Sequence, residues 1–345
     1  MPNIEGESSV DSSLAKGHGK NLFALLIPIS GLIFVFLLLL LLIIFYVPDN
    51  VDNFLSVQNL KTILKQTVIV GIGALAMTMI IVSGGIDLSA GSVVALAAVA
   101  CAHAVNWCDG NIFIGGFIPL PVVFAIMVGA GVGFLNGTIS ARLGIAPFIV
   151  TLGMMLVARG LAEGFADETV VRSPDNFLKT LMMREPNTKW LVFAYGVWIN
   201  IILFLVMVIL MRFSVFGRRI YALGANEEAA RYSGINVIRN RILIFTLGGA
   251  MFGLAGVMSY AEIGDGDPTT AVALELDIIA AVVIGGASLA GGRGTVFGSM
   301  IGAIIITLLY NGCVMLRVDD WVQKVLIGGI IVAAVWVDGI RTGRE

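Results

Sequence analysis

Uncharged apolar runs dominate this sequence and restrict the folds open to it. The first run covers residues 21–48 and contains no charged side chain. About 20 apolar residues are enough for a helix to cross the hydrocarbon core of a bilayer. Over the whole chain, 58% of the residues are hydrophobic and 13% are charged, against about 25% charged in a typical soluble domain. A soluble domain cannot hide so much apolar surface, so the sequence predicts an all-α polytopic membrane protein.

Nine further apolar segments follow, which predicts about ten transmembrane helices, with eight as the lower limit. They lie at residues 62–82, 91–106, 120–141, 147–165, 190–211, 242–260, 274–289, 296–316 and 321–337. The third and eighth helices, at residues 91–106 and 274–289, are short and adjoin glycine-rich breaks. Non-helical backbone at membrane depth must be packed in protein or line a cavity. We therefore expect irregular backbone beside both short helices.

The distribution of Lys and Arg predicts that both termini are cytoplasmic. The expected organisation is a polar tail of residues 1–21, one transmembrane domain of residues 22–340 and a tail of residues 341–345. Its longest loops are residues 212–241 on the inner side and 166–189 on the outer side. Twelve Lys and Arg residues fall in the predicted inner segments and eight in the outer ones, as the positive-inside rule requires. Lys61 and Lys65 are the exceptions.

No signature of a catalytic or metal centre is present in the sequence. It lacks a glycine-rich phosphate loop followed by Lys and Ser or Thr, so we expect no nucleotide-binding site. His18 and His103 have no partners at metal-ligand spacing, and the three cysteines form no such pattern. With a net charge of -2, nothing indicates a nucleic-acid partner. We expect no catalytic residue, metal or cofactor in this chain, which is therefore not predicted to be an enzyme.

One pair of ionisable residues falls inside a predicted helix. Arg159 and Glu163 are four residues apart and can form an ion pair on one helix face. Ionisable groups within a membrane often mark transport pathways, so the pair is either structural or part of a polar path. An ion-coupled secondary transporter of a small polar solute is thus the alternative function to keep open.

The inner loop contains a short helix with its own start and stop signals. Asn226 is a favourable N-cap, and Glu227 and Glu228 place negative charge in the first turn. Ala229 and Ala230 favour the helix, Ser233 follows in the next turn, and the glycines at 224 and 234 border the segment. Because such a helix is too short to be stable alone, it is either a solvated connector or a surface that docks into a partner.

Two glycine-rich motifs are predicted at the inner face. The first contains Gly84, Gly85, Asp87 and Ser89, and either polar residue could cap the next helix. It is read as a tight turn or as a gate at the inner mouth. The second begins with Gly285 and Gly286 and resembles the first in the order of its small residues and leucine, although this likeness does not establish an inverted repeat.

A few polar residues lie in or beside the apolar spans. They are Asn136, Ser140, Thr151 and Asn311. A sugar pathway needs hydrogen-bonding walls, so these residues are candidates for its lining. The other reading is that they form hydrogen bonds between helices. Glycines four residues apart, as at 129, 133 and 137 and at 249 and 253, predict close helix packing.

Taken together, these segments resemble the membrane permeases of bacterial ABC sugar importers, in the ribose/galactose/xylose branch. The resemblance covers nearly the whole chain after the polar tail. It is carried, in order, by residues 78–83 leading into Gly-Gly-Ile-Asp-Leu-Ser, and by residues 147–153, 172–175, 216–224, 226–234 and 275–286. A related permease branch carries branched-chain amino acids, but the Gly-Gly-Ile-Asp-Leu-Ser and Glu-Leu-Asp segments favour the sugar branch. Within the wider family, autoinducer-type and nucleoside substrates stay open as alternatives.

The resemblance implies a ten-helix fold of the type II importer kind in the bacterial inner membrane. It implies that residues 224–234 form the coupling helix that docks on a separate ATPase chain, which binds ATP and Mg²⁺. It also implies a solute-binding protein outside the membrane and a second permease, either a copy or a paralogue, surrounded by membrane lipids. The function that follows is transport of a ribose-, xylose- or galactose-like monosaccharide, without covalent chemistry in this chain.

Overall fold

The computed structural model describes residues 28–109, 113–114, 118–185 and 192–342. The predicted N-terminal tail, residues 1–21, lies outside them. After a first helix, Pro28–Tyr46, come η1 (Pro48–Asn50), α2 (Val51–Phe54), α3 (Val57–Val82), α4 (Ala90–Trp107), β1 (Phe113–Ile114), β2 (Ile118–Pro119), α5 (Leu120–Leu143), α6 (Pro147–Phe165), η2 (Phe177–Thr180), α7 (Tyr195–Phe213), α8 (Val215–Ala225), α9 (Glu227–Tyr232), α10 (Val237–Ile263), α11 (Leu274–Ile284), α12 (Val296–Met315) and α13 (Asp320–Thr342).

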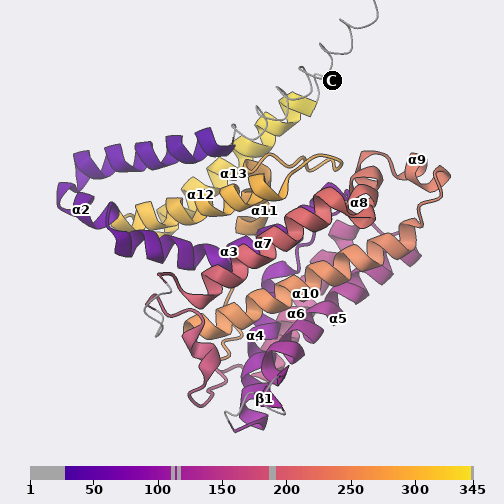
Figure 1. Cartoon of the computed structure of the whole chain (residues 1–345), viewed down its shortest axis with the longest axis horizontal. Helices are drawn as coiled ribbons and strands as arrows, with labels where there is room; N and C mark the ends of the chain where they lie inside the picture. The colour runs from indigo at the N-terminus through magenta and orange to yellow at the C-terminus, as the bar shows by residue number, and fades with distance from the viewer. Residues whose placement is uncertain (1–27, 110–112, 115–117, 186–191, 343–345) are drawn as a thin grey trace, which may run out of the picture.

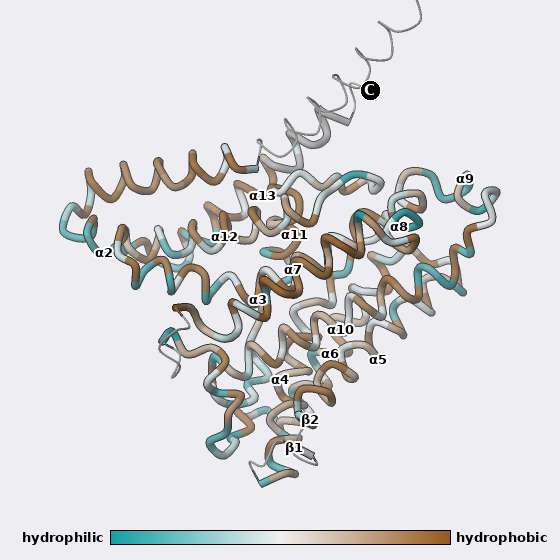
Figure 2. The backbone as a smooth tube through the Cα atoms, in the orientation of Figure 1, coloured by the Kyte–Doolittle hydropathy of each residue, from teal (hydrophilic) through white to brown (hydrophobic). Residues whose placement is uncertain are grey.

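Eight of the described helices are long and apolar enough to cross a membrane, which confirms the lower limit expected from the sequence. They are the first helix and α3, α4, α5, α6, α7, α10 and α12. Two more helices, the short α11 and the C-terminal α13, fall where the eighth and tenth apolar segments were predicted. Figure 2 shows hydrophobic residues along the helices and hydrophilic residues at their ends and in the loops.

The core is built around α3 and α4, which are the most buried of the long helices. In Figure 1, α10 lies along α5 at one side of these helices, and the first helix lies beside α12 at the other. Helices α5 and α10 contact each other very closely. A Cβ atom added to Gly129 would lie only 2.3 Å from the carbonyl oxygen of Gly249, so there is no room for a side chain at this position. The glycine spacing therefore serves packing here, as predicted.

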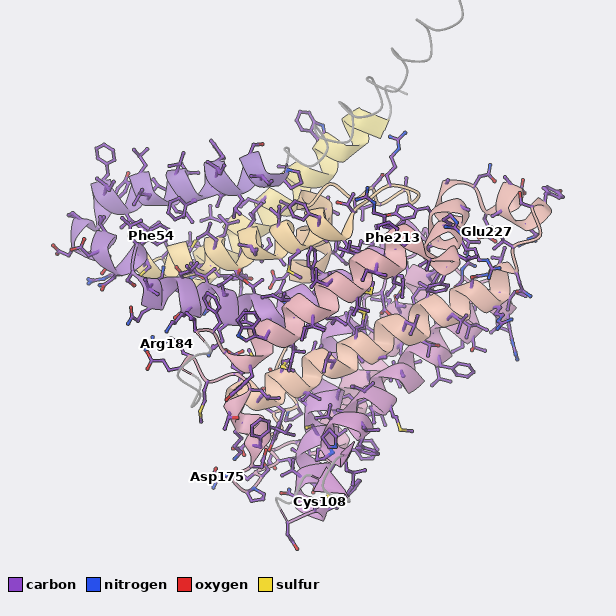
Figure 3. All side chains as sticks on the ribbon, viewed as in Figure 1. Phe54, Cys108, Asp175, Arg184, Phe213 and Glu227 are labelled. Atoms are coloured by element: carbon purple, nitrogen blue, oxygen red, sulfur yellow. The ribbon has the colours of Figure 1, made fainter. Side chains whose placement is uncertain are left out.

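Loops gather at two ends of the bundle. The end that carries α9, here called the α9 end, is formed by residues 83–89, 144–146, 214–236 and 285–295. The other, here called the α2 end, is formed by residues 47–56, 166–185 and 316–319. Figure 3 shows Glu227 at the α9 end, and Arg184 and Asp175 far from it. The sequence-based orientation of the termini relative to the cell stays a prediction.

Irregular backbone accompanies both short helices, in agreement with the sequence. Residues 83–89 connect α3 to α4, and residues 285–295 connect α11 to α12, at the two glycine-rich breaks. A further irregular segment, residues 264–273, precedes α11 and runs along α4, because Gly266 lies against Val99 and Ala102 while Ala271 reaches Gly91 near the start of α4. Ala271 and Ala273 have positive φ angles of 58° and 63°. Tertiary contacts must hold these residues, since left-handed backbone is costly for alanine.

Candidate functional site

The loop helix predicted at the α9 end is present and is capped as expected. The Asn226 side chain accepts a hydrogen bond from the backbone N–H of Ala229 at 2.9 Å, and α9 begins at the next residue. Glu227 and Glu228 occupy its first turn. Gly234, two residues beyond the last helical residue, has a φ of 81°. The structure adds a second helix, α8, that leads directly into α9 and whose N-cap is Ser214.

An ion pair ties the start of α9 to α10 of the transmembrane domain. The Glu227 carboxylate lies 3.2 Å from the Arg231 guanidinium within α9 and 2.5 Å from that of Arg241 on α10. An exposed pair contributes little, about 0–1 kcal/mol, so its main effect here is to orient the short helix. Glu227 therefore serves as an anchor for α9.

The outer face of α9 is exposed in the part of the chain that the structure describes. Ala230 is buried against the loop, whereas Glu228, Ala229 and Ser233 are exposed. The Tyr232 side chain is 90% exposed, more than any other large hydrophobic residue described. A small-residue face with a projecting aromatic ring is the kind of surface that fills a pocket in a partner.

Behind α9, three segments of the chain contact one another through glycine residues. We call the contact formed by Gly84, Gly224, Gly291 and Gly292 the glycine junction. A Cβ atom on Gly224 would clash with the Val82 carbonyl oxygen, at 1.8 Å, and with the Gly292 nitrogen, at 2.5 Å. The Gly292 N–H donates to the same Val82 oxygen at 2.9 Å. The junction therefore joins the end of α8 to both glycine-rich motifs, which the sequence placed at one face but not in contact with the loop helix.

A hydrogen bond reinforces the junction. The Tyr221 hydroxyl on α8 donates to the carbonyl oxygen of Gly294 at 2.8 Å. Burial raises the pKa of this hydroxyl, so it stays protonated and remains a donor. These contacts connect α8 both to the turn after α3 and to the loop between α11 and α12.

The first glycine motif is a closed turn held by polar side chains. Gly84 has a φ of 84°, which favours glycine. The buried Asp87 carboxylate accepts the backbone N–H of Ser89 at 2.8 Å and its hydroxyl at 2.6 Å. Neither residue caps α4 in the predicted way, because Ser89 is the N-cap but its side chain makes no capping bond. Asp87 instead folds the turn that precedes the helix.

Neighbouring helices supply the remaining bonds to this turn. The Asn136 side-chain amide on α5 donates to the Ser89 hydroxyl at 3.0 Å. The Thr151 hydroxyl on α6 accepts from the Leu88 N–H at 3.1 Å and donates to the Ile86 carbonyl oxygen at 3.2 Å. Two candidate pathway residues thus support the turn, and a role in lining a pathway stays a prediction.

The second motif combines a tight turn with close packing. Gly286 has a φ of 91°. A Cβ atom on Gly285 would lie 2.4 Å from the backbone of Gly298 on α12. The motif therefore allows α11 and α12 to approach closely just before the loop reaches the glycine junction.

The ion pair that the spacing of Arg159 and Glu163 allows is absent from the ion pairs that the described residues form, and a place in a polar path stays a prediction. Arg159 instead donates to the carbonyl oxygens of Pro268, at 2.5 Å, and Thr270, at 2.9 Å. These residues belong to the irregular segment before α11. The carbonyl groups of Pro268 and Thr270 belong to no helix or strand, and a buried carbonyl needs a donor.

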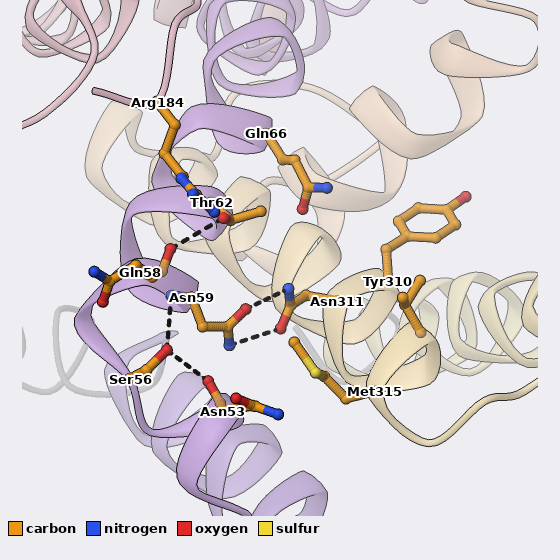
Figure 4. Close-up of a pocket in the computed structure, with 11 residues that line it drawn as sticks. Asn53, Ser56, Gln58, Asn59, Thr62, Gln66, Arg184, Tyr310, Asn311 and Met315 are labelled. Atoms are coloured by element: carbon orange, nitrogen blue, oxygen red, sulfur yellow. Dashed lines mark hydrogen bonds between the residues drawn. The ribbon is translucent and has the colours of Figure 1, made fainter. Parts of the chain in front are cut away.

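The other two candidate lining residues also make hydrogen bonds. The Ser140 hydroxyl donates to the Ile145 carbonyl oxygen at 2.9 Å, which closes the turn between α5 and α6. The Asn311 and Asn59 side chains exchange two hydrogen bonds, at 2.8 and 3.0 Å, between α12 and α3. Asn311 also borders an open cavity at the α2 end (Figure 4). Within the described ranges, no cluster of His, Cys, Asp and Glu side chains has the arrangement of a metal site.

Comparison with known proteins agrees with this architecture. Residues 59–335 match the family described as "Branched-chain amino acid transport system / permease component". The chain is 37% identical over 302 residues to the ribose import permease protein RbsC of Escherichia coli K12, covering 88% of this chain and 92% of that protein. It is 34% identical over 338 residues to the L-arabinose ABC transporter permease protein AraH of Azospirillum brasilense, covering 98% and 95%.

A third relative gives a similar result. The galactose/methyl galactoside import permease protein MglC of Salmonella typhimurium is 34% identical over 324 residues, covering 92% of this chain and 95% of that protein. No solved structure matches the chain. The similarity to sugar permeases thus extends through the loop helices and both glycine motifs.

Proposed function

The chain belongs to the permease family of the branched-chain amino acid transport type, and from this membership we propose that it is the membrane-spanning subunit of an ATP-driven monosaccharide importer. It is a multi-pass membrane protein of the inner membrane. The observation that carries the proposal is similarity to sugar permeases over 88% or more of the chain. The relatives named here are described as permeases for ribose, L-arabinose and galactose.

In this proposal the chain itself does no covalent chemistry. ATP and Mg²⁺ bind to a separate ATPase subunit, and a solute-binding protein delivers the sugar. A second permease, either a copy or a paralogue, completes the pathway. Polar but uncharged residues suit a sugar, because its hydroxyl groups need hydrogen-bond partners rather than counter-ions.

The coupling surface of the proposal is α9. Tyr232, Ala229 and Ser233 are exposed on a capped helix that the Glu227 ion pairs hold in place. Its seat in a cleft of the ATPase would bury the aromatic ring, and the glycine junction behind it would pass movement to the helices. The α9 end is then cytoplasmic, with both termini, and the loop at residues 166–185 of the α2 end faces the binding protein.

Reconstitution tests the proposal directly. The chain, its ATPase and its binding protein are reconstituted together in liposomes. We expect uptake of a labelled pentose or hexose only when ATP is supplied on the side of the membrane where the ATPase is bound. Tyr232→Ala should lower affinity for the ATPase by tenfold or more, since removing an aromatic anchor costs about 2 kcal/mol or more. Tyr46→Ala, at a tyrosine that is 78% exposed near the α2 end, is the matched control and should leave this affinity unchanged.

The rival mechanism makes the opposite prediction. An ion-coupled transporter would take up the solute without the ATPase and would lose uptake when an ionophore collapses the ion gradient. That result would refute the proposed function.

A further inference from the structure

An open cavity of about 360 Å³ lies at the α2 end, between α3, α12 and the loop after η2 (Figure 4). Its polar lining comes from separate parts of the chain and includes Gln58, Thr62 and Gln66 of α3, Arg184 of the loop, and Tyr310 and Asn311 of α12. The volume falls within the range of about 300–1,000 Å³ that is usual for small-molecule sites.

The floor of the cavity is rigid. Asn59 and Asn311 exchange two side-chain hydrogen bonds, and each is only 5% exposed. The Asn59 amide also donates to the carbonyl oxygen of Phe54 at 3.0 Å. The two asparagines therefore lock α3 to α12 and leave the residues above them to meet a ligand.

The walls carry unused hydrogen-bonding groups. In the part of the chain that the structure describes, the side chains of Gln58, Gln66 and Arg184 make no hydrogen bond and all three are exposed. Each glutamine amide offers two donors and an acceptor, and the guanidinium offers further donors. The lining contains no Asp or Glu, and the nearby Asp277 carboxylate accepts a hydrogen bond from Tyr310 at 3.1 Å. This chemistry matches a neutral polyhydroxyl compound better than a cation.

The depth of Gln66 in the membrane argues that the cavity does not face lipid. Gln58, Thr62 and Gln66 are spaced four residues apart on one face of α3. The 26 residues of α3 span about 39 Å, against about 30 Å of hydrocarbon core, so roughly 9 Å of helix at most extends beyond it. Gln66 lies about 14 Å from the start of α3, and is therefore at hydrocarbon depth. An exposed amide there is costly unless it faces water or polar groups.

We propose that this cavity binds the monosaccharide as it enters the permease from the binding protein. The inference rests on the proposed function, and it assigns sugar recognition to Gln58, Gln66 and Arg184. Arg184 belongs to the loop that we propose faces the binding protein, so the cavity lies where a released sugar would first meet polar groups of this chain. The Gln66 amide then holds the sugar at membrane depth before it moves on.

The test uses the complete reconstituted importer and labelled D-ribose, L-arabinose and D-galactose. The variant is Gln58→Met with Gln66→Met, which keeps side-chain length and removes both amides. The matched control is Leu60→Met, at an exposed residue of the same helix outside the cavity. We expect uptake by the double variant to fall about tenfold, from the loss of two hydrogen bonds, and the ratio between the three sugars to change. Stimulation of ATP hydrolysis by the loaded binding protein should remain within twofold of wild type.

Other outcomes separate the possible failures. Wild-type uptake of every sugar by the double variant would overturn the inference and leave the proposed function standing. An equal loss of uptake for all three sugars, together with lost stimulation of ATP hydrolysis, would also overturn the inference. In that case the residues around the cavity would serve to dock the binding protein rather than to bind the sugar. If the double variant does not assemble, Gln66→Asn, which retains an amide, must change the sugar ratio, and an unchanged ratio refutes the inference. No uptake by wild type would refute the proposed function itself.

Discussion

Replacing Gly224 by alanine tests whether the glycine junction transmits movement from α9. An added Cβ atom would lie 1.8 Å from the Val82 carbonyl oxygen, whereas ordinary contacts begin near 3.4 Å. The two backbones must therefore separate by about 1.6 Å, because no side chain can rotate away. Overpacking of this kind costs about 1–3 kcal/mol, which exceeds the 0.5–1 kcal/mol that alanine contributes over glycine in a helix.

The expected functional result is weaker coupling. If α8 shifts, α9 shifts with it, and a loss of about 1–3 kcal/mol corresponds to roughly 5- to 150-fold in coupled activity. The assay is sugar-stimulated ATP hydrolysis and uptake by the reconstituted importer, with thermal unfolding measured on the same samples. Gly131→Ala is the control, since a Cβ atom at this helical glycine meets nothing within 4 Å.

Two results would refute the reasoning about Gly224. One is normal coupled uptake by Gly224→Ala at unchanged thermal stability. This result would show that the two backbones at the glycine junction can separate without a loss of stability or coupling. If this variant fails to assemble, Tyr221→Phe removes only the hydroxyl that donates to Gly294. We expect a milder loss, about three- to tenfold from one buried hydrogen bond, and no loss at all would contradict the proposed transmission.

Three further predictions follow from local contacts. Gly129→Ala should destabilise the α5–α10 contact by about 1–3 kcal/mol in thermal unfolding, because its Cβ atom would lie 2.3 Å from a backbone oxygen of α10, whereas Gly131→Ala should not. Asn226→Ala should cost about 1 kcal/mol of α9 stability through loss of the cap, seen as faster amide hydrogen exchange confined to α9. Arg159→Met should destabilise the chain by about 2–6 kcal/mol, since two carbonyl oxygens each lose a donor; unchanged thermal unfolding would argue against this anchoring role.

The functional surfaces could be predicted only in part from sequence. The boundaries of α9 followed from Asn226 and Gly234, because capping is a local property of the chain and its preferred residues. The cavity at the α2 end could not be predicted in this way. Lys61 and Lys65 were noted as exceptions to the charge pattern of the predicted outer side, but nothing in the sequence showed that Gln66 and Arg184 lie around one cavity.

Arg159 shows why contacts between distant segments were harder to infer. A spacing of four residues made Glu163 the obvious partner, since the two side chains share a helix face. The structure instead brings the carbonyl oxygens of Pro268 and Thr270, more than 100 residues away, to the guanidinium. Their unmet need for donors arises from an irregular segment whose course depends on how it packs along α4.

The sequence by itself determined the class of protein, the approximate number and places of the spanning helices, the start and stop of α9 and the turns at Gly84 and Gly286. These features depend on hydrophobicity, spacing and backbone preference over a few residues, which are readable along the chain. Tertiary structure alone decided that the end of α8 meets both glycine motifs, and that α3, α12 and a distant loop enclose a polar cavity. Such contacts join segments that are far apart in sequence, and their geometry depends on the packing of whole helices rather than on any local preference.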